Sequence, residues 1–174
     1  MQKISVMING LPGNVAKVIA RHAMADSRFN VLPYALTGPE LDAKECHVGS
    51  LAVELIRPDV QENRIAAIIA AEAPFISVDF THPTAVNANA DFYCRHKLPF
   101  VMGTTGGDRQ RLLDTVVKSG NVAVIAPNMA KQIVGFQAMM AYAAENFPNL
   151  FKGYRLTIRE SHQAGKADTS GTAK

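Results

Sequence analysis

Apolar, strand-like runs alternate with helix-like patterns along most of this 174-residue chain, from Lys3 to about residue 150. Such alternation is typical of βαβ units, in which helices connect parallel strands of one sheet. The predicted strands are Lys3–Asn9, Asn30–Leu36, Phe75–Phe80, Pro99–Met102 and Asn121–Ala126. The predicted helices, several with apolar residues at i, i+3 and i+4, are Val15–Ala25, Gln61–Ala71, Ala85–Arg95, Asp108–Lys118 and Lys131–Asn146. The pattern predicts a doubly wound α/β domain.

Two segments depart from this alternation. Residues 37–61 are weakly patterned and are interrupted by a Gly-Pro and an Arg-Pro pair. We expect a loop-rich stretch there, with one short strand around Ser50–Leu55 and no functional residues. Residues 154–159 alternate apolar and polar side chains, which predicts a strand with one polar face. We therefore expect one domain over residues 1–130 and the start of a second, α+β domain over residues 131–174.

Composition narrows the class of protein without naming a function. The formal net charge of +3 is spread along the chain, which argues against a nucleic-acid partner. Cys46 and Cys94 form no zinc-type pattern, so no metal and no disulfide framework is expected. The most apolar stretch, Ile65–Val78, is too short to span a bilayer. The first strand leaves no room for a leader, so we expect a cytoplasmic protein, or one of the plastid stroma if the source is a plant or alga.

The turn after the first predicted strand reads Gly10-Leu-Pro-Gly13-Asn14-Val-Ala16 and opens a helix. Glycines in such a turn let the backbone approach a pyrophosphate, whose charge is favoured by the free N–H groups of a helix N-terminus. A purely structural turn is the alternative for this motif taken alone. Its place directly after the first strand favours a Rossmann-like, dinucleotide-binding domain.

The end of the second predicted strand, Tyr34–Gly38, carries no acidic residue. An acid at this position in many such folds binds the ribose hydroxyls of the unphosphorylated cofactor. Without one, a 2′-phosphate meets no repulsion, and Lys17 or Thr37 can contact it. This favours NADPH and leaves NADH possible, because Lys17 can equally be a solvated helix charge.

Three later strand ends carry polar or glycine-rich exits. Ligands of open parallel sheets bind outside the carboxyl ends of the strands. The first two exits therefore predict contacts to the nicotinamide and its ribose, from Phe80, Thr81, Gly103, Thr104 and Thr105. The third can line the ring pocket with Pro127, Asn128 and Met129. In isolation, the first two exits are equally compatible with ordinary loops and helix caps such as Thr84 and Asp108, and Asn128 and Met129 with a cap and core filler.

The segment Glu160–Thr172 concentrates chemically active side chains. It holds His162 and Lys166, followed by Ser170-Gly171-Thr172. A histidine, a lysine point charge and a Ser-Gly-Thr anion site are residue types suited to holding a dicarboxylate and delivering a proton. A polar surface loop is the alternative that composition alone allows.

Glu160-Ser-His-Gln-Ala-Gly-Lys-Ala-Asp-Thr-Ser-Gly-Thr-Ala173 resembles the E-x-H-x-x-x-K-x-D-x-S-G-T-A signature of the dihydrodipicolinate reductases. The blocks Asp79–Pro83, Phe100–Asp108 and Ala126–Met129 are similar to that family's other motifs, in the same order. The resemblance covers almost the whole chain. Gly-Gly-Asp after Thr105, and Gln163 after the histidine, are more like the plant-type branch.

The resemblance implies NAD(P)H-dependent reduction of 4-hydroxy-tetrahydrodipicolinate, with loss of water, to tetrahydrodipicolinate in lysine biosynthesis. His162 is then the proton donor, with Lys166 close to the reacting centre. Gln163 replaces a second histidine found in many bacterial members, and it would contact this small dicarboxylate. Ser170, Gly171 and Thr172 would bind a carboxylate, while Gly10, Gly13 and Asn14 would hold the pyrophosphate.

The resemblance also implies a longer protein that assembles as a homo-oligomer through its second domain. We therefore expect the 174-residue chain to stop partway into the substrate-binding motif, to bind nucleotide weakly and to turn over poorly. A non-catalytic nucleotide-binding homologue is the main alternative, although retention of His162 and Lys166 argues against it. An aspartate or homoserine-type dehydrogenase fits residues 160–173 less well.

Overall fold

The computed structural model describes residues 2–126, 128–155, 157, 159 and 161 of the chain. The chain divides into two compact units, Met1–Ile125 and Ala126–Lys174, which are described separately. The predicted domain boundary at residue 130 lies near this division. The assignment of the second unit to substrate binding stays a prediction.

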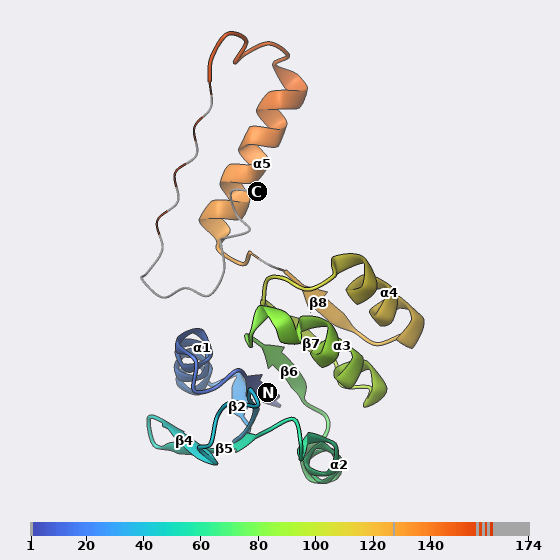
Figure 1. Ribbon diagram of the computed structural model, residues 1–174. Helices are drawn as coiled ribbons and strands as arrows, with labels where there is room; N and C mark the ends of the chain where they lie inside the picture. The colour runs from blue at the N-terminus through green and yellow to red at the C-terminus, as the bar shows by residue number, and fades with distance from the viewer. Residues whose placement is uncertain (1, 127, 156, 158, 160, 162–174) are drawn as a thin grey trace. The chain divides into compact units, whose positions relative to one another are not determined.

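The first unit is built on a five-stranded parallel sheet with the order β2-β1-β6-β7-β8 (Figure 1). Its strands are β1 (Ile4–Asn9), β2 (Phe29–Val31), β6 (Ile76–Asp79), β7 (Phe100–Met102) and β8 (Ala123–Ile125). The chain leaves β1 on one side to form β2 and later returns on the other side to form β6. This change of direction confirms the predicted doubly wound α/β fold and creates a switch point beside β1.

The second predicted strand, Asn30–Leu36, is broken in two at Pro33. β2 pairs with β1, whereas β3 (Tyr34–Leu36) joins a separate sheet with the order β3-β5-β4. Pro33 has no N–H to donate to a neighbour, and its carbonyl accepts from the amide of Glu54 on β5 at 2.9 Å. The proline thus marks the point where the segment changes from one sheet to the other.

Residues 37–61 hold two strands instead of the single short one predicted. β4 (Glu45–Val48) and β5 (Leu51–Ile56) form an antiparallel hairpin. Gly49 supplies the turn with a φ of +61°. The sequence pattern missed β4 because it is short and its Glu45 and His47 side chains are exposed, as expected for an edge strand of the small sheet.

The helices of the first unit closely match the predicted ones. They are α1 (Asn14–Ala25), α2 (Gln61–Glu72), α3 (Val86–Arg95) and α4 (Arg109–Ser119), with a short 3-10 helix, η1 (Pro83–Ala85), before α3. The predicted cap Asp108 starts α4 by accepting from the amide of Arg111 at 3.0 Å. At η1 the capping side chain is His82, which accepts from the amide of Thr84.

The strands of the first unit have apolar side chains on both faces, which feed two separate core clusters. Val6 and Ile8 of β1 join a cluster with α1 and the β4–β5 hairpin. Met7, which points the opposite way, joins a cluster with residues of α2, α3 and α4. In Figure 1, α3 and α4 lie side by side, as their contacts confirm. Helices on both faces explain why these strands read as nearly continuous apolar runs.

The second unit contains α5 (Lys131–Asn146), which has the bounds predicted from the sequence. The strand predicted over residues 154–159 is wrong at Tyr154, Arg155, Thr157 and Arg159, which are not in a strand. Leu156 and Ile158 lie outside the described residues. A strand needs a neighbour to pair its backbone groups, and the described part of the chain has none after Ile125. Among the described helices, none is long and apolar enough to cross a membrane.

Candidate nucleotide-binding cleft

A cleft of about 590 Å³ lies where the carboxyl ends of β1, β3 and β6 meet. Gly10–Gly13, Leu36–Leu41 and Phe80–His82 form most of its walls. These segments follow the three strands on either side of the switch point. A cleft at that place is where open α/β sheets bind their ligands.

The turn after β1 is fixed by tight backbone packing at Gly10. Its φ is +99°, and a Cβ atom placed there would lie 2.2 Å from the carbonyl oxygen of Phe80. The Gly10 amide donates to the carbonyl of Leu36 at 2.9 Å, and the Gly10 carbonyl accepts from the amide of Gly13 at 2.8 Å. Only glycine therefore fits between the ends of β3 and β6.

Helix α1 begins beside this turn, with Gly13 as its N-cap. No side chain caps the first turn, and the first turn contains no acidic residue. The partial positive charge of the helix N-terminus is therefore available to an anion in the cleft. Asn14 is the first helical residue.

The loops after β6 and β7 are packed against each other at Phe80 and Gly103. A Cβ atom on Gly103 would lie 2.2 Å from the Cζ atom of the Phe80 ring, so the ring rests directly on the glycine. The Gly103 amide also donates to the carbonyl of Asp79 at 3.0 Å. This contact brings the predicted nicotinamide-binding segments together at the end of the sheet.

The Asp79 carboxylate holds these two loops from beneath. Asp79 is fully buried. Its Oδ1 atom accepts from the hydroxyl groups of Thr81 at 2.8 Å and Thr104 at 2.7 Å, and from the Thr81 amide at 3.2 Å. Its Oδ2 atom accepts from Asn89 Nδ2 at 2.9 Å and from the Tyr93 hydroxyl at 2.7 Å. A buried carboxylate satisfied by this many donors rigidifies its surroundings.

Tyr93 and Asn9 extend this network into the core, and the sequence analysis identified neither as functional. Both side chains are fully buried, and Asn9 Nδ2 donates to the Tyr93 hydroxyl at 3.0 Å. Burial, and then the nearby Asp79 carboxylate, raise the pKa of Tyr93 well above its ordinary value. Tyr93 is therefore a neutral donor at any physiological pH. Its place on an apolar helix face gave no sign of a polar role.

The structure brings several predicted cofactor contacts together. Gly10, Gly13, Phe80 and Thr81 line the cleft, while Gly103 and Thr104 support it through Phe80 and Asp79. Thr105 follows them in the same loop after β7.

The other predicted site residues belong to the second unit or are not described. Asn128 accepts from the Ala130 amide at 3.0 Å, and Met129 is exposed. Neither residue is placed relative to the cleft. The remaining predicted residues lie outside the described part of the chain: Pro127, His162, Gln163, Lys166, Ser170, Gly171 and Thr172.

The segment after β3, from which no function was expected beyond a phosphate contact at Thr37, lines the cleft. The Thr37 hydroxyl donates to the carbonyl of Leu11 at 3.0 Å, which ties this segment to the glycine turn. Glu40 follows it and exposes a carboxylate at the cleft wall. Lys17 is not part of the wall. Burial raises the pKa of the Cys46 thiol, and the positive charge of Lys17 opposes this shift. The cleft wall thus carries an acidic residue, Glu40, although the end of β3 itself has none.

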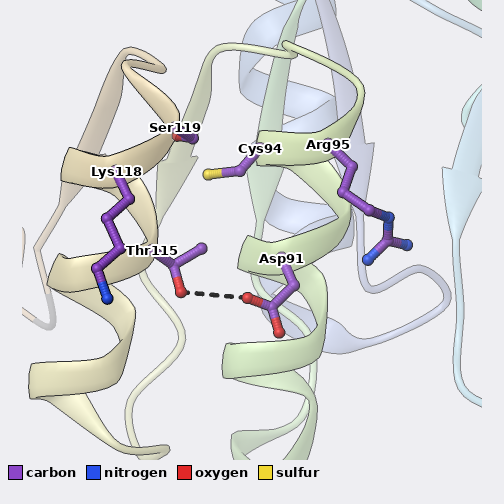
Figure 2. Close-up of a pocket in the computed structure, with 6 residues that line it drawn as sticks. All are labelled: Asp91, Cys94, Arg95, Thr115, Lys118 and Ser119. Carbon is purple, nitrogen blue, oxygen red and sulfur yellow. Dashed lines mark hydrogen bonds between the residues drawn. The ribbon is translucent and has the colours of Figure 1, made fainter.

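A second hollow, of about 460 Å³, lies between α3 and α4 (Figure 2). Figure 2 shows Asp91, whose carboxylate accepts from the Thr115 hydroxyl at 3.2 Å, and the thiol of Cys94. The Asp91 carboxylate is also paired with Arg111. The hollow is lined by the two helices alone and contains none of the strand-end residues. Its side chains are explained by helix packing and surface ion pairs.

Comparison with known proteins agrees with this geometry. A family profile described as "Dihydrodipicolinate reductase, N-terminus" matches residues 4–129. A solved structure, "Dipicolinate bound Dihydrodipicolinate reductase from Paenisporosarcina sp. TG-14", superimposes with a TM-score of 0.65 at 20% identity. The match covers 84% of this chain and 56% of that one, and it supports the fold.

Plant proteins are similar along nearly the entire sequence. The rice "Probable 4-hydroxy-tetrahydrodipicolinate reductase 2, chloroplastic" is 43% identical over 97% of this chain and 52% of its own length. The Arabidopsis thaliana "4-hydroxy-tetrahydrodipicolinate reductase 1, chloroplastic" is 41% identical over 98% of this chain and 49% of its own length. A cyanobacterial relative from Picosynechococcus is 30% identical, so the predicted plant-type resemblance is confirmed. The chain spans about half the length of the plant relatives, and it belongs to the dihydrodipicolinate reductase family.

Proposed function

We propose that this chain is the nucleotide-binding part of an NAD(P)H-dependent 4-hydroxy-tetrahydrodipicolinate reductase. The observation that carries the proposal is the cleft beside β1, whose glycine turn and helix N-terminus face the loops after β3 and β6. A dinucleotide needs this combination of a close backbone approach, an anion site and a neighbouring polar loop. Membership of the family supplies the reaction.

Different residues of the cleft would hold different parts of the cofactor. The cofactor supplies the hydride when it is bound. Gly10 and Gly13 leave room for the pyrophosphate, and the first turn of α1, starting at Asn14, faces its charge. Phe80, Thr81 and the loop Gly103–Thr105 would hold the nicotinamide end. Pro127, Asn128 and Met129 are proposed as further contacts to the nicotinamide ring.

The substrate would be the cyclic dicarboxylate bound by the segment that follows. We propose His162 as the proton donor. The positive charge of Lys166 would stabilise the negative charge that develops on the substrate's ring nitrogen as the hydride arrives. Gln163 would contact the substrate, and Ser170, Gly171 and Thr172 would hold a carboxylate. A location in the plastid stroma or cytoplasm belongs to the same proposal, since the plant relatives are named as chloroplastic. Homo-oligomerisation is proposed from the family resemblance alone.

The preference for NADPH over NADH stays a prediction. The residues that line the cleft weaken the argument for it. The preference depended on a strand end without an acid, yet Glu40 now stands at the cleft wall and Lys17 does not. A carboxylate beside the 2′ position would repel a phosphate and accept from ribose hydroxyls. We therefore propose that the cleft accepts both cofactors and that Glu40 limits the advantage of NADPH.

The test is oxidation of NADPH and of NADH with freshly generated substrate. The 174-residue chain is compared with the same chain extended by the C-terminal half of a plant relative. Activity in the extended form alone is the expected result. Turnover at a normal enzymatic rate by the 174-residue chain would show that the C-terminal half of the relatives is not needed. Nucleotide binding without activity in either form would identify a non-catalytic homologue.

A further inference from the structure

A directional chain of buried hydrogen bonds runs beneath the cleft. The Leu36 amide donates to Asn9 Oδ1 at 2.9 Å, Asn9 Nδ2 donates to the Tyr93 hydroxyl at 3.0 Å, and that hydroxyl donates to Asp79. The direction is fixed at both ends, because a backbone N–H can only donate and a carboxylate can only accept. Tyr93 is the junction between the β3 side of the cleft and the β6 side.

The far end of this chain is attached to the backbone of the cleft. Asp79 accepts from Thr81 and Thr104, and the Thr104 hydroxyl in turn accepts from the Thr81 amide at 2.9 Å. The loops after β6 and β7 are therefore cross-linked through a single carboxylate. Stability alone does not call for this arrangement, since apolar residues of similar volume are often as stabilising as a buried charge with its partners.

We propose that Tyr93 is a positioning residue for the nicotinamide end of the cleft. It acts through Asp79, whose carboxylate it orients toward Thr81 and Thr104, and it touches neither cofactor nor substrate. The adenosine and pyrophosphate end, built on Gly10, Gly13 and α1, has its own backbone supports. This inference rests on the proposed function, and it adds a residue on α3 that determines how well the far half of the cofactor is held.

The test is Tyr93→Phe in the 174-residue chain, with NADPH, NADH and ADP titrated by calorimetry. The ring packing against Phe100, with centroids 5.1 Å apart, is kept. Tyr93→Phe removes the donor to Asp79 and the acceptor of Asn9 Nδ2, while Asn9 Oδ1 keeps its hydrogen bond from the Leu36 amide. Loss of the donor to the buried Asp79 carboxylate should weaken both dinucleotides by about tenfold. ADP lacks the nicotinamide half of the cofactor. Its affinity for Tyr93→Phe should stay within about twofold of its affinity for the parent chain, because the adenosine and pyrophosphate end of the cleft is intact. Amide exchange at Thr81 should become faster.

Tyr34→Phe is the matched control, because it removes a hydroxyl from a half-buried tyrosine of β3 for which no hydrogen bond is described. It should leave all three affinities unchanged. Equal weakening of ADP and the dinucleotides by Tyr93→Phe would overturn the proposal, as would no weakening at all. A parent chain that binds neither dinucleotide would instead refute the proposed function.

Where Tyr93→Phe does not fold, Asn89→Ala removes another donor to Asp79 from a less buried position. Asn89 lines the cleft and also donates to the Thr81 hydroxyl, so this variant loosens the same loop at two contacts. The same selective loss is expected for it, and uniform loss or none overturns the proposal.

Discussion

Gly10 is the residue on which the geometry of the cleft depends most directly. We expect Gly10→Ala to lower the free energy of unfolding by at least about 2 kcal/mol. The alanine Cβ would clash with the Phe80 carbonyl, and a φ of +99° is strained for any residue that has a Cβ. Nucleotide binding should be lost with it. Urea unfolding and calorimetric titration measure the two effects.

Gly120→Ala is the matched control for that substitution. Gly120 ends α4 with a φ of +63°, but nothing lies within 4 Å of its Cβ position. It should cost about 1 kcal/mol for the backbone conformation alone and leave nucleotide affinity unchanged. If both variants cost the same, the close approach at Phe80 has no energetic consequence.

Glu40 tests cofactor choice at the same scale. We expect Glu40→Gln to improve the affinity for NADPH relative to NADH by about threefold to tenfold, since it removes a like charge near the 2′-phosphate in a solvent-exposed setting. Parallel titrations of both cofactors give the ratio. Asp42→Asn, an acid two residues later that does not line the cleft, should leave it unchanged. An unaltered ratio in Glu40→Gln would place Glu40 away from the 2′ position.

Prediction from sequence succeeded for the positions of residues that follow strand ends, while their roles in cofactor binding stay predictions. Gly10, Phe80 and Thr81 stand at strand ends, where the fold class predicts ligands, so their positions were readable from the pattern. Tyr93 and Asn9 were missed because each lies at a buried position of a helix or strand. Their hydrogen bond joins residues 84 positions apart in the sequence, so it becomes visible only in the folded structure.

At the scale of elements, helices were predicted best because their apolar periodicity extends over ten or more residues. α5 was predicted with its observed bounds, and α4 was helped by the cap at Asp108. Strands of three or four residues carry too little pattern, so the break at Pro33 and the edge strand β4 were missed. Both errors concern the small sheet, whose position depends on pairing between distant segments.

The turn between α1 and β2 offers a pH test of one element. The Asp26 carboxylate accepts from the Arg28 guanidinium at 2.6 Å, which lowers its pKa from 3.8 to about 2. A lowered pKa stabilises the folded chain above pH 3.8, and this contribution is lost as the pH falls through about 2. Asp26→Asn should therefore be slightly less stable than the parent at pH 7, and most of this difference should be gone near pH 2.

Urea unfolding midpoints of both chains across this pH range provide the measurement. The pair is exposed, so the difference at pH 7 should be small and should shrink in 1 M salt. A difference that persists at pH 2 would mean that the ionised carboxylate is not its source.

At the scale of the whole molecule, the two units differ in how fully they are specified. Both core clusters of buried residues are drawn from positions 6–112. The fold of the first unit could therefore be predicted from patterning within that range. The predicted chemistry of His162, Lys166 and Ser170–Thr172 depends on residue types and a family signature, and these residues lie outside the described part of the chain.

The first unit should therefore fold and bind nucleotide by itself. We expect residues 1–130 to unfold in a single cooperative transition, with the urea midpoint of the 174-residue chain, because the buried side chains and the cleft beside β1 are contained in it. Affinities for NADPH and NADH should fall only by the contribution of residues after 130. A lower midpoint would show that the second unit stabilises the first, and the two would then form one cooperative domain rather than two.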